Sequence, residues 1–312
     1  MFIKRRVLLF MKKYEMLPTE ENIIETLYND PINRNKDIVY FYNILQAQES
    51  ASAIAIDGRW GSGKTFFVRQ TKMVINALNP SSTIDEETKA KATVRLPFSK
   101  NDEENENYSI AVYYDAWEND NDTEPVLSLI YEITKQLSVD FSLSDISVVK
   151  TAGAIIEAIS GHNINGIKDA LTSEDPFKKF KEEKDVEQKI KDFFASILVE
   201  RGNRLIIFID ELDRCKPTFA VHLLEQIKHY IFDDRITFVF SINLEQLQHT
   251  IKQYYGADFD SCRYLDRFFD LRISMPPANM EKFYSEIGLE SRYYVDIVTK
   301  RIINMYNFEL RE

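Results

Sequence analysis

The sequence predicts an α/β protein built on a doubly wound, mainly parallel sheet. Short apolar runs alternate along the chain with longer segments of helical periodicity, which is the pattern of strands joined by crossover helices. Several apolar runs, such as residues 205–209, lack the apolar–polar alternation of a half-exposed strand. Runs of this kind are typical of strands buried on both faces of a parallel sheet. Ligands of such sheets bind at the carboxyl ends of the strands.

Strands and helices are expected in a regular order. The expected strands are residues 53–57, 109–115, 205–209, 236–242 and 271–275. The expected helices are residues 37–48, 66–78, 125–137, 218–230, 245–255, 260–269, 279–286 and 290–306, with shorter helices within 144–171 and a further helix from Asp175-Pro176. Helices are assigned from apolar residues at helical spacing, and strands from runs of β-branched and aromatic residues.

Local signals mark several of these boundaries. Asn79-Pro80 closes the helix over residues 66–78, because proline cannot continue a helix. Pro125 and the pair Asp175-Pro176 stand at helix starts, where proline has no intrahelical N–H bond to lose and aspartate can cap the helix. Pro276-Pro277 breaks the chain after the last strand. The sheet is therefore expected to end near residue 277.

The connection between the first strand and its helix fits a phosphate-binding loop. It matches the pattern G-x-x-x-x-G-K-[ST] without a mismatch and is followed by Phe66. The matching residues are Gly58-Arg59-Trp60-Gly61-Ser62-Gly63-Lys64-Thr65. In this geometry backbone N–H groups converge on phosphate oxygens, the helix N-terminus adds partial positive charge, and Lys64 adds a full charge. We therefore expect residues 58–66 to bind a nucleotide.

A second motif closes the third expected strand, which ends in two carboxylates. This is the Walker B arrangement, in which Asp210 is expected to hold Mg²⁺ together with the hydroxyl of Thr65. Magnesium suits this pair because it prefers oxygen ligands, uses few protein groups and keeps several waters. Glu211 is placed to polarise the attacking water, while Lys64 holds the phosphates. The alternative for Asp210 is a capping role alone.

Four further polar residues each have two interpretations. Asn243 closes the strand over residues 236–242 and is expected either to orient water beside the γ-phosphate or to cap the following helix. Arg214, Arg263 and Arg267 are candidates for an arginine finger, which stabilises charge in the transition state. For Arg214 the alternatives are a neighbouring subunit or an acid of its own chain. The alternative for the other two arginines is an ordinary surface or packing role.

Composition restricts the class of protein further. The net charge of −11 argues against broad nucleic-acid binding through a basic surface, although it leaves room for a local basic groove. Only two cysteines are present, Cys215 and Cys262, which suits a reduced cytoplasmic protein without a disulfide framework. No stretch reaches the roughly 18 uncharged apolar residues that a membrane span needs. We therefore expect a cytoplasmic protein that does not cross a membrane.

Taken together, these motifs resemble those of the KAP family of P-loop NTPases. The resemblance covers roughly residues 30–280 and rests on blocks that stand in family order. The blocks are the glycine loop with Phe66, Tyr114-Asp115-Ala116-Trp117-Glu118, Ile209-Asp210-Glu211-Leu212-Asp213-Arg214-Cys215-Lys216-Pro217, residues 220–228 and Tyr264-Leu265-Asp266-Arg267-Phe268-Phe269-Asp270. This combination is far more specific than the glycine loop alone.

The resemblance implies an additional-strand ATPase, related to AAA+ and STAND proteins, that uses ATP, Mg²⁺ and a catalytic glutamate. We expect ATP hydrolysis to drive a conformational or assembly switch, with a homo-oligomer or a protein effector as partner and bacterial anti-phage defence as the setting. Two features depart from the family pattern. Many members carry transmembrane helices between the two nucleotide motifs, where this chain has none, and Asn243 stands where the family often has aspartate.

The chain is expected to divide into three parts. They are an N-terminal tail and helix over residues 1–29, the P-loop NTPase domain over 30–277, and the start of a helical lid over 278–312 that continues beyond this sequence. Two insertions are expected within the NTPase domain. They are a polar, mobile insert over residues 80–107, with a short hairpin at 93–98, and a helical insertion over 124–202.

Two other functions stay open at this point. One is a nucleotide-gated binding or scaffold module that holds ATP with negligible turnover and docks partners through residues 217–230 and 245–269. Steady-state phosphate release separates it from an ATPase. The other is a DNA-associated ATPase of the initiator type, against which the acidic charge counts. DNA-stimulated turnover would support that second alternative.

Overall fold

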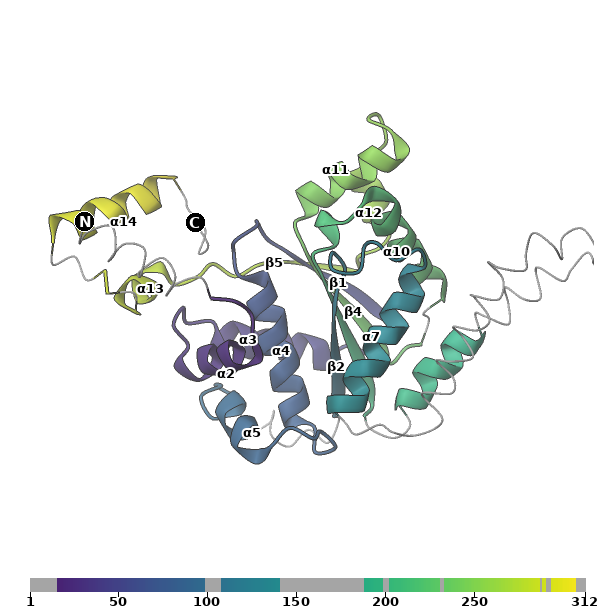
Figure 1. Cartoon of the computed structure of the whole chain (residues 1–312), viewed down its shortest axis with the longest axis horizontal. Coiled ribbons are helices and arrows are strands. Elements are labelled where there is room, and N and C mark those ends of the chain that lie inside the picture. The colour runs from purple at the N-terminus through teal and green to yellow at the C-terminus, as the bar shows by residue number, and fades with distance from the viewer. Residues whose placement is uncertain are drawn as a thin grey trace, which may run out of the picture.

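A parallel sheet lies at the centre of the computed structural model (Figure 1), which describes residues 16–98, 108–140, 188–198, 202–230, 233–286, 288–289 and 293–306. The strands within these residues are β1 (Ser52–Asp57), β2 (Ser109–Asp115), β3 (Arg204–Asp210), β4 (Ile236–Ile242) and β5 (Leu271–Ser274). They lie in the order β2-β3-β4-β1-β5, and each neighbouring pair is parallel. The predicted α/β fold with a parallel sheet is confirmed.

Helices cover both faces of the sheet, which gives a three-layer arrangement (Figure 1). One layer holds α2 (Glu20–Asn29), α3 (Asn35–Gln46), α4 (Lys64–Leu78) and α5 (Glu86–Thr93). The other holds α7 (Pro125–Asp140), α10 (Pro217–Tyr230), α11 (Leu244–Tyr255) and helical residues 188–198. Successive side chains of β1 alternate between the layers, with Ile54 and Ile56 packed on the α4 side and Ala55 on the other. Both faces of this strand are therefore buried.

Helix boundaries fall within a few residues of the predicted ones. α4 begins at Lys64, because Gly63 caps it in a left-handed conformation with φ of 85°. α7 and α10 begin at Pro125 and Pro217, where proline has no intrahelical N–H bond to lose. Among the described helices, none is long and apolar enough to cross a membrane.

The segment after α4 differs from the prediction. Residues Glu86–Thr93 form α5, and residues 94–98 form a turn without any strand, so the hairpin expected at residues 93–98 is wrong. Asp85 caps this helix by accepting a 2.9 Å hydrogen bond from the N–H of Thr88. The buried side chain of Ala92 packs in the core that α5 shares with α2 and α4. Local capping and this packing stabilise a helix where the sequence alone indicated a polar, mobile insert.

Several predicted segments lie outside the described residues. They are the tail over residues 1–15, the remainder of the insert at 99–107, the short helices within 144–171 and the helix start at Asp175-Pro176. The division into three parts therefore stays a prediction.

The chain after β5 passes the glycine loop on its way to α13 (Met280–Glu286) and α14 (Tyr294–Tyr306). In Figure 1 these helices lie to one side of the sheet, beyond α2 and α3. The N–H of Met275 donates a 2.6 Å hydrogen bond to the carbonyl of Asp57, and the N–H of Asn279 donates a 3.0 Å hydrogen bond to the carbonyl of Ile32. The connection is thus held against β1 and against the turn between α2 and α3.

Candidate active site

The glycine loop leaves the end of β1 and enters α4 with glycine at the positions where the backbone demands it. Gly61 and Gly63 have φ of 84° and 85°, in the left-handed region that other residues avoid. Gly58 is crowded instead, since a Cβ there would lie 2.8 Å from Cβ of Met275 and 3.0 Å from Oγ of Ser62. All three glycines are therefore needed for this path of the backbone.

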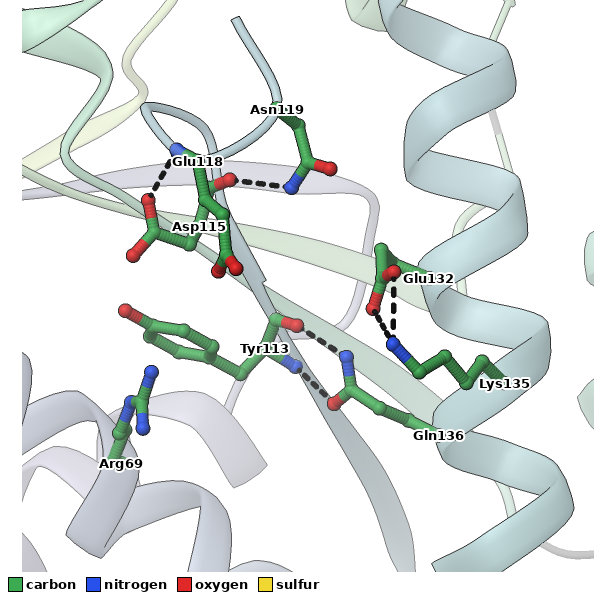
Figure 2. Close-up of a pocket in the computed structure, with 8 residues that line it drawn as sticks. All are labelled: Arg69, Tyr113, Asp115, Glu118, Asn119, Glu132, Lys135 and Gln136. Carbon is green, nitrogen blue, oxygen red and sulfur yellow. Dashed lines mark hydrogen bonds and ion pairs between the residues drawn. The ribbon is translucent and has the colours of Figure 1, made fainter. Parts of the chain in front are cut away.

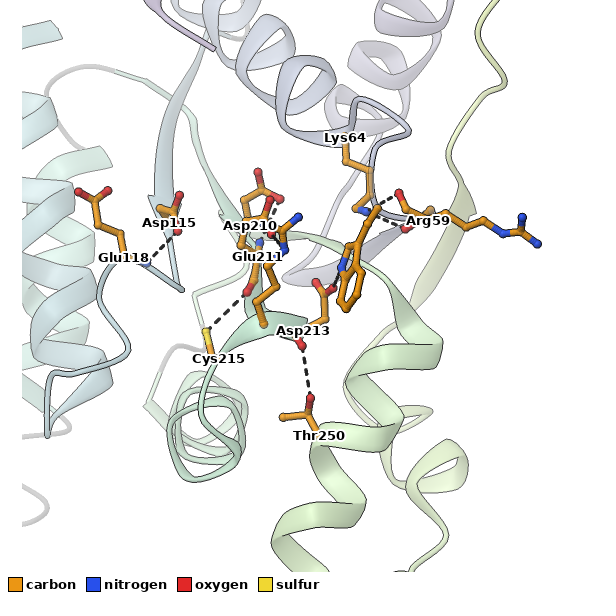
Figure 3. A network of polar contacts seen from close by, with 12 residues as sticks. Arg59, Lys64, Asp115, Glu118, Asp210, Glu211, Asp213, Cys215 and Thr250 are labelled. Atoms are coloured by element: carbon orange, nitrogen blue, oxygen red, sulfur yellow. Dashed lines mark hydrogen bonds and ion pairs between the residues drawn. The ribbon is translucent and has the colours of Figure 1, made fainter. Parts of the chain in front are cut away.

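Lys64 lies back over the loop that it follows. Its Nζ donates hydrogen bonds to the carbonyls of Gly58, at 2.6 Å, and Arg59, at 3.1 Å. Figure 3 shows the side chain pointing toward Arg59 and toward the acidic residues after β3. Burial lowers the pKa of Lys64, whereas the charges of Asp213 and Asp210 raise it. The ammonium group is therefore held inside the loop and close to the acids.

Two more groups prepare the loop for an anion. The Oγ of Ser62 is buried and has no hydrogen-bond partner among the described residues. The first N–H groups of α4, from Lys64 on, have no acceptor within the helix, as at every helix start. The loop therefore presents hydroxyl, N–H and ammonium donors together, which is the donor set that a phosphate chain requires.

Asp210 ends β3 and is almost fully buried, at 1% exposure. Its Oδ2 accepts a 3.0 Å hydrogen bond from the hydroxyl of Tyr113, and its Oδ1 accepts one of the same length from the N–H of Glu211. The guanidinium of Arg69 lies 4.2 Å from the ring centre of Tyr113. Burial and the charge of Asp210 raise the pKa of Tyr113, so the hydroxyl stays a donor. The sequence did not single out Tyr113, whose only signal is its position near the end of β2.

Glu211 is held in an unusual conformation directly after Asp210. Its φ of 61° lies in the left-handed region, which is uncommon for a residue with a side chain. The carboxylate pairs through Oε2 with Nε of Arg214, three residues later. Burial raises the pKa of Glu211 to about 7, the neighbouring charge of Asp210 adds to the rise, and Arg214 opposes it. Of the two interpretations of Arg214, the structure contains the contact with an acid of its own chain.

Asp213 joins the turn after β3 to the glycine loop. Its Oδ2 accepts a 2.6 Å hydrogen bond from Nε1 of Trp60, and its carbonyl accepts one of 3.3 Å from Oγ1 of Thr250. Figure 3 shows Asp213 between Thr250 of α11 and the loop that carries Lys64. Burial raises the pKa of Asp213, while the bond from Trp60 lowers it. The sequence placed both motif residues near the site but did not predict their contact.

The remaining candidates are Asn243, whose backbone hydrogen-bonds to Asp213, and two arginines. Asn243 caps α11, since its Oδ1 accepts a 3.3 Å hydrogen bond from the N–H of Gln246, which is the second of its two expected roles. Arg263 belongs to α12 (Ser261–Leu265) and Arg267 follows that helix, and both are exposed. Among the described residues, no hydrogen bond or ion pair joins either arginine to Lys64, Asp210 or Glu211. Their role as arginine fingers stays a prediction.

A polar cavity of about 220 Å³ opens at the outer edge of β2, beside Tyr113 (Figure 2). It is lined by Arg69, Tyr113, Asp115, Glu118, Asn119, Glu132, Lys135 and Gln136. The side-chain amide of Gln136 pairs with the N–H and carbonyl of Tyr113, and so covers the edge of the strand. The cavity therefore borders Asp210 through Tyr113 but does not open over the glycine loop.

Fold and site together define the class of protein. A parallel sheet with a glycine loop after β1 and an acidic pair after β3 is the arrangement of a P-loop NTPase. The sequence model described as the KAP family P-loop domain matches residues 34–295, which is most of the chain. The chain therefore belongs to the KAP family. A comparison with curated protein sequences finds no match.

Proposed function

We propose that this protein binds ATP with Mg²⁺, hydrolyses the bond to the γ-phosphate, and uses the reaction to switch its conformation or assembly. The observation that carries the proposal is the convergence of Lys64, Asp210 and Glu211 at the carboxyl ends of β1 and β3. Membership of a P-loop family supports nucleotide binding. Among alternatives, the acidic pair after β3 favours hydrolysis over binding alone.

The residues of the loop fit the phosphate chain. The unpartnered Oγ of Ser62, the N–H groups at the start of α4 and Nζ of Lys64 are all donors, and phosphate oxygens are acceptors. The hydroxyl of Thr65 and a carboxylate oxygen of Asp210 would hold Mg²⁺, which prefers oxygen ligands. When bound there, Mg²⁺ would supply positive charge to the phosphate oxygens. Tyr113 orients Asp210 through the hydroxyl hydrogen bond.

Glu211 is the proposed base of the reaction. A carboxylate directly after the metal ligand can accept the proton of the attacking water. Burial raises the pKa of Glu211 above that of a free glutamate, which makes its carboxylate a stronger base. Lys64 and the loop donors stabilise the charge that develops on the phosphate oxygens. These steps do not require Asn243, Arg263 or Arg267. A role for Asn243 in orienting water, or for either arginine as a finger, would add to them.

A path of polar contacts supports the proposed switch. Arg34, at 4% exposure, donates from Nη2 to the carbonyls of Ser62 and Pro276, each at 2.9 Å. Lys282 of α13 pairs with Asp30, at 3.7 Å, in the turn just before Arg34. A change in the conformation of the glycine loop would therefore displace the connection that leads to α13 and α14. We propose that these helices carry the output to an oligomer or effector.

The biological setting is inferred from the family alone. Anti-phage defence in a bacterial cytoplasm is the proposal that the family supports, and the two free cysteines, Cys215 and Cys262, suit that compartment. A nucleotide-gated scaffold with negligible turnover is the second candidate. The observation in its favour is the ion pair between Glu211 and Arg214. A carboxylate that is paired with arginine is a weaker base, because the positive charge stabilises its ionised form.

Phosphate release and nucleotide binding test the proposal. Lys64→Ala should lose both, because it removes the ammonium group that lies over the carbonyls of Gly58 and Arg59. Lys252→Ala, at an exposed lysine of α11, is the matched control and should behave as wild type. The hydrolytic proposal is wrong if wild-type protein with MgATP releases phosphate no faster than Lys64→Ala.

A further inference from the structure

Arg214 lies between the only two tryptophans of the chain. Its guanidinium carbon is 5.6 Å from the ring centre of Trp60 and 5.5 Å from that of Trp117. Trp60 belongs to the glycine loop, and Trp117 to the loop that follows β2. Guanidinium groups are attracted to indole faces at such distances. We refer to Trp60, Trp117 and Arg214 together as the tryptophan clamp.

Each tryptophan of the clamp lies in a loop that is fixed by further hydrogen bonds. Trp60 is fixed by its hydrogen bond to Asp213, the residue before Arg214. The loop that carries Trp117 is closed onto the end of β2, because Oδ1 of Asp115 accepts a 3.0 Å hydrogen bond from the N–H of Glu118. Asp115 is the register partner of Asp210 in the sheet. The clamp therefore joins the glycine loop, β2 and the turn after β3.

The arginine of the clamp pairs with the carboxylate of Glu211. Arg214 and Glu211 side chains are only 25% and 19% exposed, so their ion pair is shielded from water. The pair is made through Oε2 of Glu211, so Oε1 is the carboxylate oxygen that is not part of this contact. A glutamate side chain otherwise samples several rotamers, and that freedom lowers the fraction of time in a reactive orientation.

We propose that Arg214 is a positioning residue, which the two tryptophans hold so that it aims the carboxylate of Glu211 at the attacking water. The inference rests on the hydrolytic function proposed above and deepens it. Arg214 then acts through Glu211 and makes no transition-state contact of its own with the phosphate, unlike an arginine finger. This distinction can be measured, because two residues that act through one another are not additive.

A double-mutant cycle in single-turnover hydrolysis tests the proposal. Arg214→Ala should lower the rate about 10- to 100-fold while the nucleotide Kd stays within about twofold. In a Glu211→Gln background the same substitution should change the residual rate by less than about twofold. Trp117→Ala, which removes one side of the clamp, should lower the rate about 3- to 10-fold. Arg214→Lys keeps the charge without the planar group and should be intermediate.

Two results would overturn the proposal while the hydrolytic function stands. An equal loss from Arg214→Ala in both backgrounds would mean that Arg214 acts on the phosphate directly. A rate at or above wild type would mean that Arg214 restrains Glu211. Should Arg214→Ala fail to fold, Arg214→Lys takes its place in the cycle under the same criteria. If wild type does not hydrolyse ATP, or Glu211→Gln does so equally fast, the proposed function itself fails.

Discussion

Trp60 donates a 2.6 Å hydrogen bond to Asp213 and thereby fastens the glycine loop to the turn after β3. Asp213 is 5% exposed, so loss of the indole donor leaves a buried carboxylate with fewer partners. We expect Trp60→Phe to lower the free energy of unfolding by about 1–2 kcal/mol. Trp117→Phe is the control, since that indole donates no hydrogen bond within the described part of the chain and is 53% exposed. Equal stabilities in urea for the two variants would contradict this account.

Tyr113 should affect the metal rather than the nucleotide. Tyr113→Phe removes the hydroxyl that orients Asp210 while it keeps the ring beneath Arg69. We expect the Mg²⁺ concentration for half-maximal hydrolysis to rise about 10-fold, as for other residues that orient a metal ligand. Tyr131→Phe, at an exposed position of α7, is the matched control. An unchanged Mg²⁺ dependence would remove Tyr113 from the proposed metal site.

Arg34 should couple the loop to the helices beyond the sheet. Arg34→Ala leaves the carbonyls of Ser62 and Pro276 without this donor, so we expect a loss of about 2–3 kcal/mol in the free energy of unfolding. In wild type, MgATP should change the rate of limited proteolysis within residues 275–306, and in the variant it should not. Arg95→Ala, at an exposed arginine, should respond as wild type. Equal responses in all three proteins would exclude this path of coupling.

A pH-dependent contribution to stability is expected before β4. Hydrogen bonds from Arg235 lower the pKa of Asp233 below its ordinary value of 3.8. A group whose pKa is lower in the folded than in the unfolded state stabilises the protein at pH values above its unfolded pKa. This stabilisation is lost as the pH falls through the folded pKa. Asp233→Asn should therefore cost up to about 1 kcal/mol at pH 7 and nothing at a pH below both values. Asp234→Asn, at the exposed neighbour, should show no such difference, and a pH-independent loss in Asp233→Asn would contradict the assignment.

The parts that could be predicted from the sequence are those whose signal is local. The glycine loop and the pair Asp210-Glu211 are consecutive residues next to apolar strands, so their chemistry and place in the sheet could both be inferred. The helix α5 also has a local signal in the sequence, since Asp85 is a capping residue followed by two glutamates in the first turn. The polar composition of that segment was given more weight than its capping signal, which is why a mobile insert was expected there.

The contacts that complete the site join residues far apart in the chain. Tyr113 and Asp210 are 97 residues apart, and Trp60 and Asp213 are 153 apart. Both pairs meet only because the strand order brings β2 beside β3 and the turn after β3 near the loop after β1. The left-handed conformation of Glu211 could not be predicted from the sequence either, because glutamate rarely adopts it. Such features depend on the assembled sheet.

The central claim is that Glu211 activates water for hydrolysis of ATP. The most direct measurement is the nucleotide that remains bound after Glu211→Gln and wild type are each incubated with MgATP, together with the phosphate released. The account predicts that Glu211→Gln binds ATP as tightly as wild type, retains it unhydrolysed, and releases phosphate at least about 100-fold more slowly. Equal phosphate release by the two proteins, with ADP bound to both, would contradict it.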